Sequence, residues 1–238
     1  MGVRALVLLS GGQDSTTCLA AAIAAHGVEN VEALSIDYGQ RHGKEVTAAQ
    51  AIARLLGVEW DVVDLEDVLL STSPLLSDAS LDDVRGIVAE PGAPRRVEQT
   101  FVPMRNALFL VVAANWSVAG RCKRIYVGVS EEDYGGYPDC RREFLESFMA
   151  MVGFALGEAG PPPILECPLL HLDKAGTVKL MRSLEVAVPR AWEALGLSWS
   201  CYEGGERPCG KCHACVLRAR GFERAGEFDP ALEGIDGG

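Results

Sequence analysis

Residues 3–25 read VRALVLLSGGQDSTTCLAAAIAA. Residues 3–9 are almost entirely Val, Leu and Ala, which is typical of a strand buried on both of its faces. Gly11 and Gly12 interrupt this run, and residues 15–25 then place their large apolar side chains at helical spacing. We therefore predict a buried strand, a glycine turn and a helix, in that order.

The same alternation continues along the chain. Strands are predicted at residues 31–37, 59–65, 125–129 and 164–167, and helices at 45–56, 104–119, 141–158, 173–183 and 214–224. The helix at 141–158 is expected to bury Phe144, Phe148, Met151 and Ala155. Asp173 is the expected N-cap of the helix that follows it. This order favours an α/β fold, a Rossmann-like parallel sheet with helices on both faces.

Three segments are expected from the changes in composition. Residues 1–195 carry the strand and helix pattern, residues 196–225 hold a cysteine cluster, and residues 226–238 form an acidic tail. Inside the first segment, prolines and glycines punctuate residues 66–100, which predicts a long loop.

Composition narrows the classes of function. The 238 residues carry a net charge of −11, and the sequence pI is about 4.9. This excess of acidic residues disfavours sequence-independent binding to nucleic acid, which usually needs a basic surface. The longest apolar run outside the first strand, residues 107–114, is far shorter than the roughly 20 residues of a transmembrane helix. No secretion signal is evident, so we expect a cytoplasmic protein without a membrane partner.

The glycine turn has the composition of an anion site. Gly11 and Gly12 allow a ligand to approach the backbone, and the following helix offers unpaired N–H groups at its start. Asp14 could hold Mg²⁺ against phosphate oxygens. The alternative is an ordinary turn that caps the helix. The stretch fits neither the Walker A nor the dinucleotide-binding glycine pattern, and SGGxDS after the first strand resembles the pyrophosphate loop of ATP pyrophosphatases.

Four cysteines lie within fifteen residues near the C-terminus. Cys201, Cys209, Cys212 and Cys215 offer the four thiolates of a closed tetrahedral zinc site. A redox CxxC pair would leave two of these cysteines unexplained, and an iron–sulfur cluster remains the main rival to zinc. His213 is not needed by such a site and is expected to be exposed.

Taken together, these segments resemble the 7-cyano-7-deazaguanine synthase family of the queuosine pathway. The matching segments are LSGGQDSTTCL (9–19), DYGQRH (37–42), FVPMRN (101–106), GYPDCR (136–141), LDK (172–174) and the cysteine cluster. The resemblance implies an adenine nucleotide alpha hydrolase-like fold. It also implies that 7-carboxy-7-deazaguanine, ammonia and ATP react through adenylated intermediates to give a nitrile, with release of AMP and pyrophosphate.

The resemblance also implies roles for individual residues. Asp14, Lys174 and Arg105 are the expected catalytic residues, the two cations neutralising phosphate charge. The residues expected to bind ATP are Leu9, Ser10, Gly11, Gly12, Gln13, Asp14, Ser15, Thr16, Thr17, Cys18, Leu19, Asp37 and Arg41. The residues expected to bind the deazaguanine base are Glu131, Asp133, Tyr134, Tyr137 and Asp139, whose carboxylates accept N–H groups and whose rings stack.

Other functions fit parts of the sequence. A pyrophosphate-loop enzyme that modifies tRNA would share the loop, although the acidic charge disfavours it. A paralogue that ligates the deazaguanine to a protein amine would share both motifs, and a non-catalytic zinc-knuckle adaptor would share only the cysteines. The sequence leaves open the source of ammonia and whether the chain forms a homodimer.

Overall fold

The fold is that of a computed structural model, which describes residues 2–40, 43–69, 73, 75–76, 100–131 and 137–232. Within these residues five strands form one sheet in the order β3-β2-β1-β4-β5, and every neighbouring pair is parallel. The strands are β1 (Ala5–Leu8), β2 (Val31–Asp37), β3 (Glu59–Asp64), β4 (Arg124–Tyr126) and β5 (Ile164–Glu166). The predicted α/β class and parallel sheet are confirmed.

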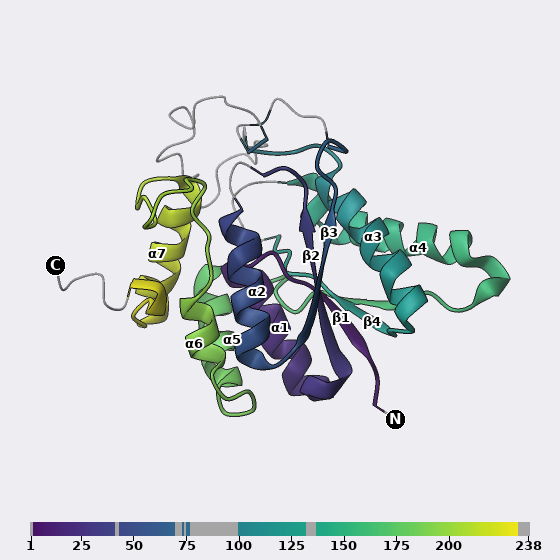
Figure 1. The fold of residues 1–238 in the computed structure, drawn as a ribbon, viewed down its shortest axis with the longest axis horizontal. Helices are drawn as coiled ribbons and strands as arrows, with labels where there is room; N and C mark the ends of the chain where they lie inside the picture. The colour runs from purple at the N-terminus through teal and green to yellow at the C-terminus, as the bar shows by residue number, and fades with distance from the viewer. Residues whose placement is uncertain are drawn as a thin grey trace.

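Helices cover both faces of the sheet (Figure 1). They are α1 (Gln13–His26), α2 (Lys44–Leu56), α3 (Arg105–Gly120), α4 (Arg142–Leu156), α5 (Lys174–Leu184), α6 (Ala191–Gly196) and α7 (His213–Ala225). One apolar core lies between the sheet and the α1, α2, α5 and α6 helices, and a second lies beneath α3 and α4. The predicted helices on both faces are thus confirmed.

The central strand, β1, is covered by apolar side chains on both faces of the sheet. Ala5 and Val7 of β1 belong to the first core, whereas Leu6 between them belongs to the second. Because successive side chains of a strand point to opposite faces, a strand covered on both sides needs an uninterrupted apolar run. The chain runs outward from β1 through β2 to β3 and then returns to the other side of β1 at β4. This reversal creates the crevice at the strand ends where open α/β sheets bind ligands.

The buried face of α4 differs from the prediction. Leu145, Phe148 and Val152 are its buried residues, whereas Met151 is 45% exposed and Ala155 also faces outward. The buried stripe is therefore rotated by about one residue from the expected one. The helix carries apolar side chains on more than one side, and one of them, Phe154, is 89% exposed. The periodicity alone therefore did not define a single buried face.

The last described residues pack against the molecule. Asp229 is buried and accepts two hydrogen bonds from Arg218, at 2.6 and 2.9 Å, while the same guanidinium donates to Ser198 at 2.8 Å. These contacts connect the stretch after α7 to the loop that follows α6. The expected acidic tail is therefore packed against the protein at Asp229. The boundaries of the three segments remain a prediction.

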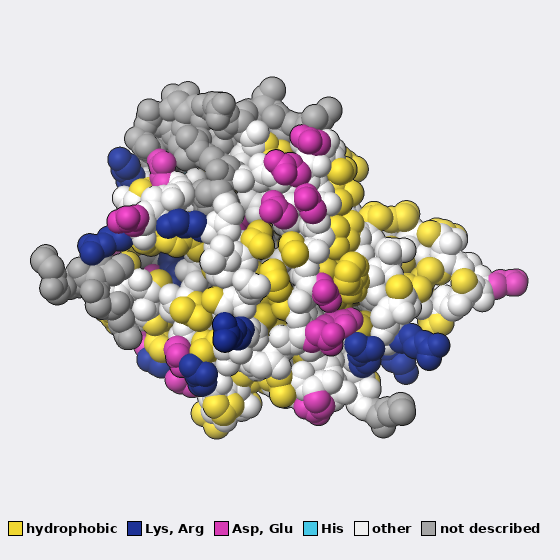
Figure 2. All heavy atoms as spheres, viewed as in Figure 1, with side chains coloured by type: hydrophobic (Ala, Val, Ile, Leu, Met, Phe, Trp, Pro, Cys, Tyr) yellow, Lys and Arg dark blue, Asp and Glu magenta, His cyan; other side chains and the backbone are white. Residues whose placement is uncertain are grey.

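Charged side chains are distributed in small groups on the face that Figure 2 draws. Lys and Arg side chains lie in separate patches with Asp and Glu side chains between them. No helix in the described part of the chain is long and apolar enough to cross a membrane.

Candidate functional site

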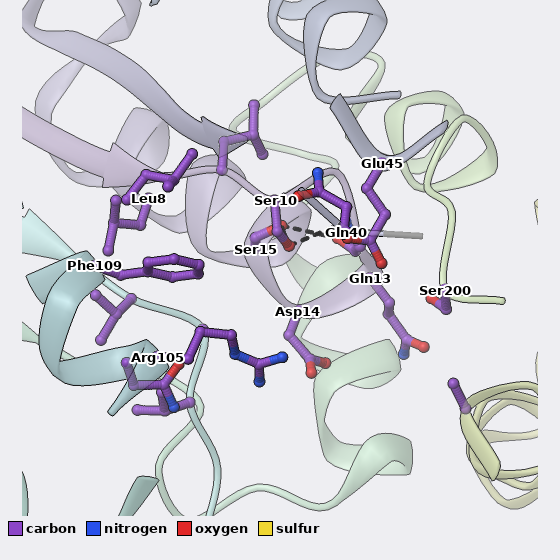
Figure 3. Close-up of a pocket in the computed structure, with 18 of the residues that line it drawn as sticks. Leu8, Ser10, Gln13, Asp14, Ser15, Gln40, Glu45, Arg105, Phe109 and Ser200 are labelled. Carbon is purple, nitrogen blue, oxygen red and sulfur yellow. Dashed lines mark hydrogen bonds between the residues drawn. The ribbon is translucent and has the colours of Figure 1, made fainter. Parts of the chain in front are cut away.

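A cavity of about 370 Å³ lies at the carboxyl end of the sheet (Figure 3). Its wall combines the glycine turn, the ends of the central strands, the starts of α2 and α3, and residues next to the cysteine cluster. The residues that carry its chemistry are Ser10, Asp14, Glu45, Arg105, Lys174 and Trp199. The cavity therefore occupies the crevice that the strand order creates.

The glycine turn is held in one shape by its own hydrogen bonds and by α2. The Ser15 hydroxyl donates to the Gly12 carbonyl at 3.1 Å and lies 3.0 Å from the Ser10 hydroxyl. Gly11 has a φ of +85°, and a Cβ there would lie 2.1 Å from the Glu45 carbonyl oxygen. Only glycine fits this close approach. Gly12 is the N-cap of α1 and brings no side-chain hydrogen bond, so the helix start is open to an anion.

The residues expected to bind ATP fall into three groups. Those that line the cavity are Leu9, Ser10, Gly12, Gln13, Asp14 and Ser15. Those that lie behind the wall, in the turn or in the buried part of α1, are Gly11, Thr16, Thr17, Cys18 and Leu19. Asp37 ends β2 and accepts a hydrogen bond from the Gly39 amide at 3.3 Å, and Arg41 lies outside the described residues.

Asp14 and Lys174 form an ion pair across the cavity. The Lys174 ammonium donates to Asp14 at 2.5 Å, although 160 positions separate the two residues. Lys174 is the first residue of α5, and the Asp173 carboxylate caps that helix by accepting from the Gly176 amide at 2.8 Å. The predicted N-cap is confirmed, and it fixes the point at which Lys174 leaves the helix.

Arg105 reaches the same cavity from the start of α3. Figure 3 shows its guanidinium directed toward Asp14. Burial opposes its positive charge, but Tyr38, Tyr137 and Asp139 together raise the pKa of Arg105 above its ordinary value. The cavity thus holds two basic side chains, Lys174 paired with Asp14 and Arg105 directed toward it.

Some of the residues expected to bind the base line the cavity, and others lie outside it. Tyr137 lines the cavity and shares a 2.7 Å hydrogen bond with Thr100. Asp139 is buried and accepts from the Asn106 amide in the first turn of α3 at 3.3 Å, and Glu131 accepts from the Arg142 amide at the start of α4 at 2.7 Å. Both acids therefore bind helix starts rather than line the cavity.

Asp133 and Tyr134 lie outside the described residues.

The four clustered cysteines form a compact donor set. Their sulfur atoms all lie within 4.8 Å of one another. Backbone amides of Glu203 and Cys209 donate to the Cys201 sulfur at 3.3 Å. Hydrogen bonds from the Cys201 and Cys215 thiols lower the pKa of Cys212. This group could bind a metal ion.

His213 is buried, so the prediction that it is exposed was wrong. It is the first residue of α7 and is only 4% exposed. The first turn of α7 forms part of the cavity wall, and this packing buries the imidazole between the wall and the cysteine cluster.

Two residues of the cavity wall escaped the sequence analysis. Glu45 lies in the first turn of α2, and burial raises its pKa from 4.5 to about 7, with Arg105 opposing that rise. A carboxylate just after the DYGQRH motif was the available signal. Trp199 donates from its backbone amide to the Gly11 carbonyl at 2.8 Å, and its indole N–H donates to the Cys201 carbonyl at 2.9 Å. The cysteine segment is consequently connected to the glycine turn.

Comparisons with known proteins identify relatives of this chain. The sequence model of the family described as "Queuosine biosynthesis protein QueC" matches residues 4–226. A 7-cyano-7-deazaguanine synthase of Gloeobacter violaceus is 44% identical over 95% of this chain and 94% of its own length. One from Chromobacterium violaceum is 40% identical over 97% and 93%. Among solved structures, the U34-tRNA thiolase NcsA from Methanococcus maripaludis gives a TM-score of 0.43 at 14% identity, over 99% of this chain and 68% of that one.

Proposed function

The chain belongs to the queuosine biosynthesis protein QueC family, and we propose that it acts as a carbon–nitrogen ligase that makes 7-cyano-7-deazaguanine. In the proposed reaction the carboxylate of 7-carboxy-7-deazaguanine attacks the α-phosphorus of ATP, and pyrophosphate leaves. Ammonia then displaces AMP to give the amide. The amide oxygen is adenylated in turn, and the loss of AMP leaves the nitrile.

The observation that carries this proposal is the arrangement around the glycine turn. The open start of α1 faces the same cavity as Lys174 and Arg105. Preorganised N–H donors and cations stabilise the charge that develops on leaving pyrophosphate, and they need no rearrangement during the reaction. We propose that the turn and α1 residues 9–19, with Asp37 and Arg41, bind ATP, and that Asp14, Lys174 and Arg105 act on its phosphates.

The base of the substrate is proposed to bind on the Tyr137 side of the cavity. Tyr137 offers a ring for stacking, and Asp133 and Tyr134 belong to the same segment of the chain. Glu131 and Asp139 are proposed to act by fixing that segment to the starts of α4 and α3. A carboxylate in this segment can accept hydrogen bonds from the N–H groups at the edge of a deazaguanine, and a tyrosine can stack on its rings.

Two metal ions complete the proposal. The four cysteines are proposed to hold a structural zinc ion, because sulfurs within 4.8 Å of one another suit a single tetrahedral ion with Zn–S distances of about 2.3 Å. When bound, zinc supplies folding free energy to the segment rather than chemistry. Asp14 is proposed to orient Mg²⁺ with ATP. None of the eight cysteines forms a disulfide, which supports a cytoplasmic location.

The test is a reaction of the purified protein with ATP, Mg²⁺, ammonium and 7-carboxy-7-deazaguanine. We expect the nitrile by mass and pyrophosphate in step with it. Asp14→Ala should lower both by about 10²-fold or more, whereas the exposed Asp61→Ala in β3 should leave both unchanged.

Each other result contradicts a defined part of the proposal. Pyrophosphate without nitrile would indicate another acceptor, and tRNA and protein amines are then the candidates to test. If no ATP is consumed, the chain is not this ligase.

A further inference from the structure

Glu45 is a carboxyl group in the cavity for which the reaction above assigns no role. Figure 3 shows its side chain entering the cavity beside Gln13 and Gln40, on the side away from Arg105. Among the described residues that line the cavity, the carboxylates are Asp14 and Glu45. Asp14 forms an ion pair with Lys174. Among the described residues, no Lys or Arg lies within hydrogen-bond distance of the Glu45 carboxylate, and Arg105 acts on it only from farther away.

The first turn of α2 lies against the glycine turn. A Cβ on Gly11 would lie 2.1 Å from the Glu45 carbonyl oxygen and 2.8 Å from the Ala49 amide nitrogen. This contact fixes the backbone of Glu45 beside the glycine turn, and Figure 3 shows its side chain directed into the cavity.

Both halves of the reaction must remove a proton from nitrogen. In the first half, the ammonia nitrogen forms a bond to the carbonyl carbon, the C–O bond to AMP breaks with its electron pair, and one N–H proton must leave. In the second half, adenylation of the amide oxygen gives a protonated imidate, R–C(=NH₂⁺)–O–AMP. Its nitrogen must lose both N–H protons in turn, as the C–O bond to AMP breaks with its electron pair and the C≡N bond is completed. Arg105 and Lys174 are cations and cannot accept these protons.

We propose that Glu45 is the general base of both halves, accepting the one proton that nitrogen loses as the amide forms and, in turn, each of the two protons that it loses as the nitrile forms. This inference rests on the proposed function. After each transfer the carboxyl group returns its proton to solvent through the mouth of the cavity. The group needs no second catalytic base on the wall, because the same nitrogen atom is deprotonated each time.

The surroundings of Glu45 suit this task. Burial raises its pKa from 4.5 to about 7, and the Arg105 guanidinium opposes that rise. Tyr38, which packs near both groups, is itself held neutral because burial raises its pKa. A general base is most effective when its pKa lies near the working pH, because it is then both available and basic enough to accept a proton.

Two partial reactions separate this role from ATP binding. Exchange of labelled pyrophosphate into ATP, with the acid substrate and without ammonium, reports adenylation and needs no base on nitrogen. Formation of amide and nitrile with ammonium needs the base. Glu45→Gln keeps the shape and removes the proton acceptor, so exchange should stay within about twofold while product formation falls about 10²–10⁴-fold. The exposed Glu59→Gln in β3 should change neither rate.

An equal loss in both partial reactions would overturn the proposal and place Glu45 in ATP or Mg²⁺ binding. Absence of acid-dependent exchange in the unmodified protein would instead contradict the proposed function itself.

Chemical rescue tests the same role independently. Glu45→Ala leaves space for a small carboxylate, so added formate should restore product formation in a concentration-dependent way. Formate should not restore it in Glu45→Gln, whose amide fills that space. If exchange is normal in Glu45→Ala and formate restores nothing, the base lies elsewhere and the proposal is wrong.

Discussion

Burial raises the pKa of the Glu45 carboxyl from 4.5 to about 7. The folded chain consequently binds more protons than the unfolded chain between these two pH values, and the contribution of Glu45 to stability falls as the pH rises through this window. Glu45→Gln removes the titration. We predict a variant that is about 2 kcal/mol more stable than the unmodified protein at pH 8, with a much smaller difference at pH 5.

Urea unfolding at the two pH values measures this difference. Glu59→Gln, in which an exposed carboxylate is changed, should differ from the unmodified protein by no more than about 0.5 kcal/mol at either pH. A gain from Glu45→Gln that is the same at both pH values would show that burial does not act on the charge of Glu45.

Met104 adopts a backbone conformation that suits glycine. Its φ is +65° at the N-cap of α3, and its side chain is 68% exposed. A Cβ in this left-handed region costs roughly 1–2 kcal/mol. Met104→Gly should therefore stabilise the protein by about 0.5–1 kcal/mol in urea unfolding, after the extra freedom of glycine in the unfolded chain is subtracted. Met104→Ala keeps the Cβ and should give no gain, and a gain from alanine would contradict this explanation.

At the scale of elements, α5 and α7 meet where glycine leaves room for Lys174. A Cβ on Gly221 of α7 would lie 2.7 Å from the Lys174 Cβ and 3.2 Å from its carbonyl carbon. Gly221→Ala must displace Lys174 or separate the helices, so we predict a 10- to 100-fold slower release of pyrophosphate. The better helix propensity of alanine, worth about 1 kcal/mol, should not offset this loss of rate.

Gly153→Ala in α4 is the matched control, because the nearest atom to its Cβ would be a Pro162 carbon at 4.0 Å. This variant should keep the rate of the unmodified protein. Equal rates in both alanine variants would mean that the contact at Gly221 does not position Lys174.

The elements differ in how far their sequences predicted them. β2 was predicted from residue 31 to 37 and is found there, with Val31, Ala33, Leu34 and Ile36 among its buried side chains. For α4 the periodicity predicted the helix but not its buried stripe, because apolar side chains occur on more than one side of it: Phe144 and Phe148 share one side, whereas Phe154 is exposed. Which side chains of α4 are buried depends on how the helix packs against the sheet. α6 has only six residues, too few to show a periodic signal.

At the scale of the whole molecule, the motifs predicted candidate site residues but not how they meet. Asp14 and Lys174 come together because α1 and α5 both begin at the carboxyl edge of the sheet. The sequence alone did not place Glu45 and Trp199 in the cavity wall. Their places depend on α2 resting against Gly11 and on the cysteine segment folding back over the same turn, and both contacts are long-range packing.

We expect that second contact to couple the proposed metal site to the proposed ATP site. Trp199 bonds to the Gly11 carbonyl through its amide and to the Cys201 carbonyl through its indole, and the Lys44 ammonium lies 4.5 Å from the indole ring. Removing the metal with a chelator should loosen the cysteine segment and with it this wall of the cavity. We predict that ATP binds about 5- to 150-fold more weakly to the metal-free protein, as measured by calorimetry.

Linkage requires the reverse effect as well, because the two binding free energies share one coupling term. Saturating ATP should raise the affinity of the cysteines for metal by the same factor, as measured by competition with a coloured chelator. Trp199→Phe keeps the backbone bond to Gly11 and an aromatic wall but loses the indole bond to Cys201. It should therefore bind ATP within a few-fold of the unmodified protein while the coupling shrinks. Equal ATP affinity with and without metal would show that the cysteine segment closes the cavity without the help of its metal.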